Sequence, residues 1–267
     1  MALSSSSATG VQIGLRGVSK RYMTASGDAV DALGEIDLDI AAGEFVSIVG
    51  PSGCGKSTMM MLVSGLIPAT TGTITVGGAP VKGAVSKAGI VFQRDVLLDW
   101  RTVLDNVMLP VEIKKLNKET HLKKAHDLLR SVGLAEFEEK YPAELSGGMR
   151  QRVAICRALV SDPGLLLMDE PFGALDALTR EQMNLDLQRI WLRDRNTVVF
   201  ITHSIEEAVL LSDRVVVMTS RPGRIADVLD PGLERPRGAH TRSDKRFVDC
   251  VERIRRHFMA LGVLSET

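Results

Sequence analysis

The stretch that decides the fold is Gly50-Pro-Ser-Gly-Cys-Gly-Lys-Ser-Thr58, which matches the phosphate-binding pattern G-x-x-x-x-G-K-[ST] in full. The residues before it, Glu44-Phe-Val-Ser-Ile-Val49, form a short apolar, β-branched run typical of a buried strand. The residues after it, Met59-Met-Met-Leu-Val-Ser-Gly-Leu66, contain good helix formers. The pattern therefore lies between a strand and a helix, as a phosphate loop requires, and it predicts a site for a nucleoside triphosphate.

Each part of this loop has a chemical role in holding phosphate. Its glycines let successive backbone N–H groups point inward, toward an anion that the helix dipole also favours. Lys56 reaches the outer phosphates, and the Ser57 hydroxyl is a ligand for Mg²⁺. We predict that the nucleotide contacts the whole loop, which consists of Gly50, Pro51, Ser52, Gly53, Cys54, Gly55, Lys56, Ser57 and Thr58.

Cys54 lies inside this loop and close to the start of the helix that follows it. A helix N-terminus lowers the pKa of a thiol. We therefore expect Cys54 to react with maleimides faster than Cys156 or Cys250, and bound MgATP to protect it. The alternative is an unreactive small residue that fits the turn.

Further motifs follow the phosphate loop in a fixed order. They are Gln93 after the apolar run 89–92, Leu145-Ser-Gly-Gly-Met-Arg-Gln-Arg152 at the start of a helical segment, Asp169 and Glu170 at the end of the apolar run 165–168, Ala174-Leu-Asp176, and His203 after the apolar run 197–201. The ordered set resembles the nucleotide-binding subunit of ATP-binding-cassette (ABC) transporters, over residues 11 to about 230. This resemblance implies that the nucleotide is ATP.

Asp169 and Glu170 end a strand with two carboxylates, which taken alone could be an ordinary solvent-exposed strand end. Hydrolysis of ATP requires charge neutralisation at the phosphates, an oriented water and a base. The resemblance implies that Asp169 holds Mg²⁺ and that Glu170 is the general base. It also implies that Gln93 touches both Mg²⁺ and the water, and that His203 contacts the γ-phosphate and steadies Glu170.

Tyr22 follows Gly17-Val-Ser-Lys-Arg21 and resembles the aromatic residue of the family that stacks on adenine. A tyrosine in a β layer is often ordinary packing, but we expect the stacking role here. Ring stacking tolerates different bases, so Tyr22 by itself does not select ATP over GTP.

The resemblance places part of the site in a second copy of the chain. Ser146 and the amides of Gly147 and Gly148 would meet the γ-phosphate bound to a partner, in a head-to-tail dimer with ATP between the copies. A Gly-Gly pair that opens a helix is again an anion-binding geometry. Asp176 would cross the same interface. Met149 departs from the family pattern, where glutamine is usual, and removes one polar side chain from this interface.

Strands and helices alternate along the chain, which predicts an α/β fold with a parallel sheet covered by helices. With the resemblance, this is the P-loop ABC ATPase fold, with an N-terminal antiparallel β layer and an inserted helical subdomain. A Pro-, Gly- and Arg-rich span at 221–242 is expected to be loop-rich, and five apolar residues after it to share one face of a helix: Phe247, Val248, Val251, Ile254 and Phe258. The expected divisions are a disordered tail at 1–10, an ABC ATPase domain at 11–235 (core 11–93 and 161–235, helical insertion 94–160), and a C-terminal helical extension at 236–267.

Composition excludes several classes of function. The chain has 267 residues, of which 45% are hydrophobic, and 33 basic residues balance 33 acidic ones, so no basic field indicates a nucleic-acid partner. Three widely spaced cysteines form no metal or disulfide pattern, which suits a reducing cytoplasm. The serine-rich start is no signal peptide, and no apolar run approaches the ~18 residues of a membrane span.

A single cassette without membrane helices favours the motor of an importer at the cytoplasmic face of the cell membrane, with permease subunits and an external solute-binding protein as partners. The segment Arg94–Asn106 resembles the nitrate, sulfonate and taurine importers in its Leu-Leu-x-Trp-x-Thr-Val-x-x-Asn run, although Asp99 replaces a frequent proline. The alternatives are an importer of another small organic solute, such as a thiamine-precursor pyrimidine, or an ABC ATPase that serves no transporter.

The same segment predicts where the permease docks, since in the family a permease helix sits beside this loop. Val96, Leu97, Leu98 and Trp100 form an apolar cluster between charged residues. The leucines could equally be core, whereas tryptophan is enriched among interface anchors, so we expect Trp100 to be the anchor. Arg101 and Asp105 would form a polar rim.

Overall fold

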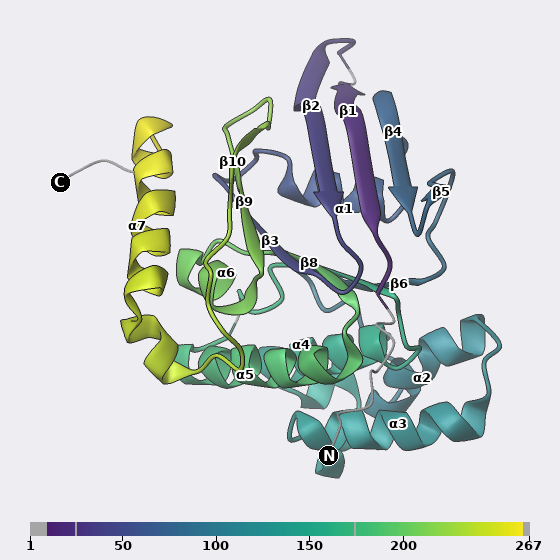
Figure 1. The fold of residues 1–267 in the computed structure, drawn as a ribbon. Coiled ribbons are helices and arrows are strands. Elements are labelled where there is room, and N and C mark those ends of the chain that lie inside the picture. The colour runs from purple at the N-terminus through teal and green to yellow at the C-terminus, as the bar shows by residue number, and fades with distance from the viewer. Residues whose placement is uncertain (1–9, 25, 174, 264–267) are drawn as a thin grey trace.

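The computed structural model describes residues 10–24, 26–173 and 175–263, so nearly all of the predicted tail at 1–10 and residues 264–267 of the predicted extension lie outside the described residues. Two sheets form the centre of the described chain (Figure 1). An upright N-terminal sheet stands beside helix α1 (Lys56–Val63), and helices α2 to α5 lie together on another side. Helix α7 (Lys245–Ala260) runs along the side away from the N-terminal sheet and packs against α6.

The central sheet carries the phosphate loop. Its strand order is β10-β9-β3-β8-β7-β6, and every neighbouring pair is parallel except β10 with β9. The strands β3, β7 and β8 are buried at every position, as expected where both faces of a parallel sheet are covered. The strands are β3 (Phe45–Val49), β6 (Ala88–Val91), β7 (Leu165–Asp169), β8 (Thr197–Ile201), β9 (Arg214–Met218) and β10 (Ile225–Leu229).

The expected parallel α/β core is confirmed, with one addition. The span 221–242, expected to be loop-rich, contains β10, which pairs antiparallel with β9 through partners such as Val228 and Val216. Prolines and glycines on either side of this five-residue strand obscured its pattern. The outcome is a mixed sheet whose only antiparallel pair lies at one edge.

The N-terminal layer is an antiparallel sheet of order β2-β1-β4-β5, as expected from its alternating pattern. Its inner face supplies Ile13, Leu15 and Val18, which are buried in a core shared with α1 and with one face of the central sheet. The strands are β1 (Ile13–Met23), β2 (Ala29–Ile40), β4 (Thr71–Val76) and β5 (Ala79–Pro80).

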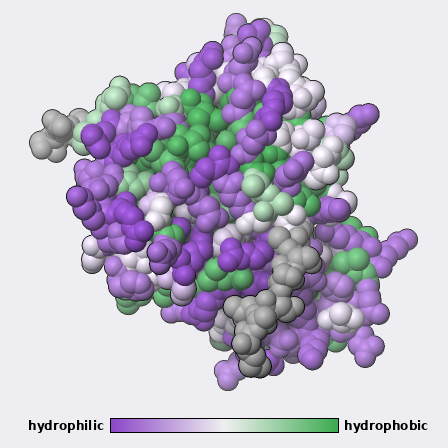
Figure 2. All heavy atoms as spheres, viewed as in Figure 1, coloured by the Kyte–Doolittle hydropathy of each residue, from purple (hydrophilic) through white to green (hydrophobic). Residues whose placement is uncertain are grey.

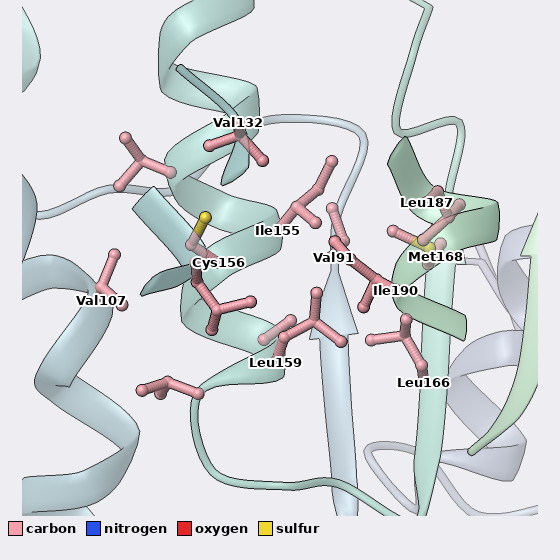
Figure 3. Close-up of a cluster of buried hydrophobic side chains, with 14 of the residues drawn as sticks. Val91, Val107, Val132, Ile155, Cys156, Leu159, Leu166, Met168, Leu187 and Ile190 are labelled. Carbon is pink, nitrogen blue, oxygen red and sulfur yellow. The ribbon is translucent and has the colours of Figure 1, made fainter. Parts of the chain in front are cut away.

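The helical block between Gln93 and the strand β7 shares its core with the central sheet. Figure 3 shows Cys156 and Leu159 of α4 between Val107 of α2 on one side and Leu166 of β7 on the other. Because α4 packs against both α2 and β7, continuous apolar packing attaches the helical block to the central sheet. Its helices are α2 (Val103–Ile113), α3 (Lys118–Ser131) and α4 (Gly147–Leu159), with 3₁₀ turns at Ala135–Phe137 and Pro142–Glu144.

Helix α5 (Ala177–Asp194) packs into the same core as the helical block. Helices α6 (Ile205–Leu211) and α7 share another core with β9 and β10 at the other end of the sheet, and a 3₁₀ turn lies at Ala239–Ser243. Four of the five apolar residues expected on one face of the last helix are buried, but Val248 is 46% exposed, and Cys250 is buried on that face instead. The 3.6-residue period explains the exchange, since 247, 250, 251, 254 and 258 align better than a set with 248.

Hydrophilic side chains cover most of the face seen in Figure 2, and apolar ones gather in its upper part, between α7 and the N-terminal sheet. Within the described residues, no helix is long and apolar enough to cross a membrane.

Candidate functional site

The phosphate loop runs from the end of β3 to the first turn of α1, with left-handed backbone at Gly53 (φ 74°) and Gly55 (φ 102°). A Cβ on Gly55 would lie 2.5 Å from a methyl of Leu33, so glycine is required there for space as well as for backbone angle. The Lys56 side chain is buried, and its Nζ donates to the carbonyls of Gly50 at 2.8 Å and Pro51 at 3.0 Å. The loop is therefore folded around its own lysine.

A cavity of about 380 Å³ opens over this loop. Its lining residues come from the N-terminal sheet, from the start of α1 and from the loops that follow β3, β6, β7, β8 and β9. Because parallel strands end at the same edge of a sheet, residues far apart in sequence converge here. The lining consists of Tyr22, Val30, Ala32, Ser52, Gly53, Gly55, Lys56, Ser57, Thr58, Gln93, Glu170, His203 and Arg221.

Two other residues of the cavity lining contact the side chain of Glu170. Gln93 Nε2 donates to Glu170 Oε2 at 3.0 Å, and His203 Nε2 lies 2.5 Å from Glu170 Oε1. Glu170 has a positive φ of 48°, which is uncommon for a residue with a side chain and turns the carboxylate out of the strand direction. Gln93 and His203, predicted residues from two other loops, thus both contact the carboxylate of Glu170.

Asp169 precedes Glu170 at the buried end of β7, and its Oδ1 has no hydrogen-bond partner among the described residues. A buried carboxylate oxygen without a donor fits a cation as its missing partner. Mg²⁺ is held in proteins by one or two carboxylates together with substrate phosphates. Among the described residues no group of three or more His, Cys, Asp or Glu side chains could hold a metal without such help.

Tyr22 lies on β1 and lines the same cavity, 37% exposed. The ammonium of Lys20 lies 5.1 Å from the centre of its ring. The partly open ring at the cavity wall is available for stacking on a planar ligand. The structure therefore brings the phosphate-loop residues that line the cavity together with Tyr22, Gln93, Glu170 and His203.

Ser146, Gly147, Gly148 and Asp176 do not line this cavity. Ser146 caps α4 by accepting from the amide of Met149 at 3.3 Å, and both Ser146 and Gly147 are exposed. Met149 itself is half-buried and packs against the main core. In this segment Met149 thus faces the core, while Ser146 and Gly147 face outward.

Asp176 caps α5, accepting from the amide of Thr179 at 3.0 Å. Hydrogen bonds from the side chain and backbone of Thr179 hold the pKa of Asp176 below its usual value. A Cβ on Gly148 would lie 2.9 Å from a methyl of Leu175, so this segment and the start of α4 touch. Leu178, two residues after Asp176, is 80% exposed.

Glu207 lies behind His203 and was not predicted as a site residue. Its Oε2 accepts from the hydroxyl of Thr202 at 2.6 Å, and that hydroxyl accepts from the amide of Ser204 at 3.0 Å. Arg180 Nε lies 3.6 Å from the other carboxylate oxygen. Burial raises the pKa of Glu207. The hydrogen bonds fix the backbone on both sides of His203; a glutamate at a buried helix position is the signal that could have identified it.

A second unpredicted cluster fixes the loop after Gln93 to α4. Arg150 Nε lies 2.9 Å from Asp95 Oδ2, and the guanidinium of Arg157 donates to the carbonyls of Asp95 at 2.7 Å and Val96 at 2.8 Å. These contacts join residues more than 50 positions apart in the sequence, so no local sequence pattern could predict them. They tie the loop to the helix that begins with Gly147.

Asn106 holds the rest of this loop. Its side chain is buried, accepts from the amide of Leu98 at 2.8 Å, and donates to the carbonyls of Leu98, Arg101 and Thr102 at 3.0–3.1 Å. Trp100, between these anchors, is 75% exposed. Leu97 packs against the main core. The apolar cluster thus divides, with one leucine inward and the tryptophan outward.

The expected lowering of the Cys54 pKa is wrong, whereas faster maleimide labelling than at Cys156 or Cys250 and protection by MgATP stay predictions. Its side chain is buried, and burial raises the pKa of the thiol despite Lys56 Nζ at 3.8 Å. Burial also raises the pKa of Cys156 to about 12 and that of Cys250 to about 11. Desolvation of the thiolate outweighs the nearby lysine and the helix start.

Comparison with known proteins gives a consistent answer. The family model described as ABC transporter matches residues 33–173. An uncharacterised ABC transporter ATP-binding protein of Methanocaldococcus jannaschii is 49% identical over 229 residues, covering 86% of this chain and 85% of the relative. The taurine import ATP-binding protein of Rhizobium johnstonii is 46% identical over 235 residues, covering 86% of this chain and 89% of the relative.

Solved structures agree. The dimeric structure of an ATP-binding cassette in a post-hydrolysis state, bound to ADP and Pi, is similar with a TM-score of 0.74 and 34% identity, covering 82% of this chain and 98% of the other. A second dimeric structure, of a bacterial ABC transporter cassette, matches with the same TM-score at 35% identity and the same coverage.

Proposed function

The chain belongs to the ABC transporter family of ATP-binding proteins and is an ATPase, and from this premise we propose that it is the motor subunit of an importer for a small anion such as nitrate, an aliphatic sulfonate or taurine. The taurine importers among its relatives support this substrate class. Other small organic solutes and a role outside transport are the competing possibilities.

The observation that carries the proposed mechanism is the contact of Gln93 and His203 with Glu170 over the phosphate loop. Glu170 acts as general base and takes a proton from the attacking water. His203 steadies that carboxylate and contacts the γ-phosphate, and Gln93 orients the water. Lys56 leaves its carbonyl partners to neutralise the phosphates, since its ammonium lies inside the loop that would hold them.

Mg²⁺ bound with the nucleotide would neutralise charge on the phosphates. Asp169 would hold it through the oxygen that lacks a partner, together with Ser57 and Gln93. Tyr22 would stack on adenine at the other end of the cavity. In this scheme the remaining loop amides and the hydroxyl of Thr58 complete the phosphate site.

A second copy completes the site in this proposal. Ser146, Gly147, Gly148 and Asp176 are exposed or half-buried and lie outside the cavity, as residues that serve a partner's nucleotide must. Two copies would pair head to tail with ATP between them, as the dimeric cassettes similar to this chain support. The ATPase domain would occupy 11–235, with the helical block at 94–160 and a C-terminal extension at 236–267.

The permease would dock beside Trp100. A groove of about 400 Å³ lies there, between β6, α2 and the loop after Gln93, and most of its lining is apolar. Val96 and Ile113, which line this groove, are 55% and 71% exposed, so neither side chain is packed in the core of the helical block. The motor would thus lie peripherally on the cytoplasmic face of the membrane, and a solute-binding protein outside would choose the cargo.

Reconstitution tests the substrate class. The chain is co-expressed with candidate permease subunits, and a complex that co-purifies is placed in liposomes with a candidate solute-binding protein. We expect ATP-driven uptake of radiolabelled taurine, sulfonate or nitrate. Uptake of a pyrimidine in place of these anions would assign the first alternative, and failure to co-purify with any permease would favour an ATPase outside transport.

A further inference from the structure

The loop that joins β9 to β10, residues 219–224, is closed on itself by Thr219. The Thr219 hydroxyl accepts from the amide of Arg224 at 3.0 Å and donates to the carbonyl of Ser220 at 3.1 Å. The amide of Thr219 donates to the carbonyl of Arg224 at 2.9 Å. These bonds across the neck give the loop one compact shape.

The same loop is hydrogen-bonded to strand β2 and packs against the phosphate loop. The amide of Gly223 donates to the carbonyl of Ala32 at 3.1 Å, and its carbonyl accepts from the amide of Gly34 at 2.9 Å. A Cβ at Gly223 would lie 1.8 Å from the carbonyl oxygen of Cys54. Only glycine allows this approach, so the backbone of the 219–224 loop rests directly on the phosphate loop.

Arg221 is carried by this loop into the nucleotide cavity. It lines the cavity together with Lys56, Ser57 and Glu170, and its Nη2 lies 3.7 Å from the position that a Cβ of Gly53 would occupy. In the described part of the chain, its guanidinium makes no hydrogen bond or ion pair. A cation held without a partner at the mouth of an anion site has its donors free for the ligand.

Arg224, in the same loop, is placed differently. Its side chain lies over Gly34 on strand β2, with Nε 2.9 Å from the position of a Cβ there, and it does not line the cavity. The loop therefore presents one arginine to the cavity and the other to the N-terminal sheet. Substitution of Arg224 can therefore serve as a control, because it changes a charge on the same loop without changing the cavity.

We propose that Arg221 is a nucleotide-binding residue that contacts the polyphosphate of ATP and of ADP beside Gly53. A guanidinium offers a planar fork of donors that matches phosphate oxygens. Lys56 is the buried cation of the site, and Arg221 adds a second one from the solvent side. The inference rests on the nucleotide site at this cavity and adds a contact to it.

The test is titration of the full-length chain with a fluorescent ADP, for the wild type, R221Q, R221K and the control R224Q. ADP is used so that binding is measured without ATP-driven pairing of copies. We expect R221Q to bind about tenfold more weakly, the loss typical of one hydrogen bond to a charged group. R221K should fall between, because it keeps the charge and loses the fork. R224Q should stay within about twofold of wild type.

Three results would overturn the assignment. R221Q within about twofold of wild type would remove Arg221 from the site. Equal weakening by R221Q and R224Q, with lowered melting temperatures, would reduce the effect to loop integrity. Unchanged ADP affinity with loss of the ATP-induced dimer in light scattering would assign Arg221 to the interface between copies. Absence of binding by the wild type itself would instead refute the nucleotide site, which keeps the two failures distinct.

Discussion

The phosphate loop and the segment Ser146–Gly148 are both glycine-rich turns that open a helix, yet the chain surrounds only one of them with partners. Around the phosphate loop, Gln93, Glu170 and His203 converge, and Lys56 is buried. None of Ser146, Gly147 and Gly148 lines that cavity, and Ser146 and Gly147 are exposed. Two similar glycine-rich helix starts on one chain thus differ in how many partners the chain gives them.

Under the proposed function, this difference indicates which part of the nucleotide site depends on a second copy of the chain. The cavity side is held by hydrogen bonds within the chain, such as Gln93–Glu170, whereas in the proposed dimer Ser146–Gly148 would gain its partners from a second copy. The side chains of Leu178 and Trp100 are also exposed, so neither contributes much to packing in the interior of the chain. We therefore expect changes on the cavity side to act on chemistry, and changes on the exposed side to act on assembly.

The largest effect is expected at the centre of the cavity. In Glu170→Gln the amide keeps the shape and its contacts with Gln93 and His203 but cannot accept the proton of the attacking water. Steady-state hydrolysis should fall by about 10²–10⁴-fold while ATP still binds and a closed dimer accumulates.

The matched control is Glu206→Gln. Glu206 is exposed on α6. Its ion pairs with Arg242 and Arg255 are long, at 3.6 Å and 3.9 Å, so the loss of its charge should leave the rate of ATP hydrolysis nearly unchanged. Malachite-green phosphate release and size-exclusion chromatography with ATP measure both variants. Normal hydrolysis by Glu170→Gln would mean that another group is the base.

An intermediate effect is expected on the exposed side, at Trp100. Trp100→Ala should leave folding and ATP binding intact and weaken association with the permease by about 2 kcal/mol, roughly 30-fold. Val248→Ala, which truncates another exposed apolar residue on α7, is the control. Pull-down at graded permease concentration gives the comparison. Undiminished capture of Trp100→Ala would move the docking surface elsewhere.

The smallest effect concerns Cys54, on the cavity side. Because burial raises the pKa of its thiol, the reactive thiolate is scarce at neutral pH, and maleimide labelling should be slower than that of a free thiol and should speed up as the pH rises. Mass spectrometry over a pH series measures it, with the unfolded protein as reference. Labelling at the free-thiol rate at pH 7 would contradict the burial argument.

Much of the fold was predictable because its signals are local. The buried strands β3, β7 and β8 are apolar runs, and the phosphate loop is a contiguous pattern. Strand β10 was missed because prolines and glycines surround it, and Val248 was misplaced by one position of helical phase. Short apolar segments next to turn residues carry too little periodicity to decide such cases.

The parts of the site that escaped prediction depend on contacts between distant residues. Arg150 meets Asp95 across 55 positions, and Arg221 reaches the cavity only because Gly223 lets its loop rest on Cys54. Glu207 was visible in the sequence, but its bond to Thr202 requires the helix and the strand end to be placed. The sequence indicates which residues are chemically competent, and tertiary packing decides which of them meet.

Mixing two inactive variants tests most directly whether one copy completes the site of another. Lys56→Ala disables the phosphate-loop half. Gly147→Asp disables the exposed half by placing a carboxylate where phosphate would bind; a Cβ there has its nearest neighbour 3.8 Å away, so the fold should tolerate the change. Each variant alone should be inactive. A mixed pair contains one site with both halves intact, so an equal mixture should recover roughly a quarter of the wild-type ATPase rate under random pairing. No recovery at any ratio, with mixed dimers shown to form, would mean that each chain acts on its own nucleotide and would contradict the account.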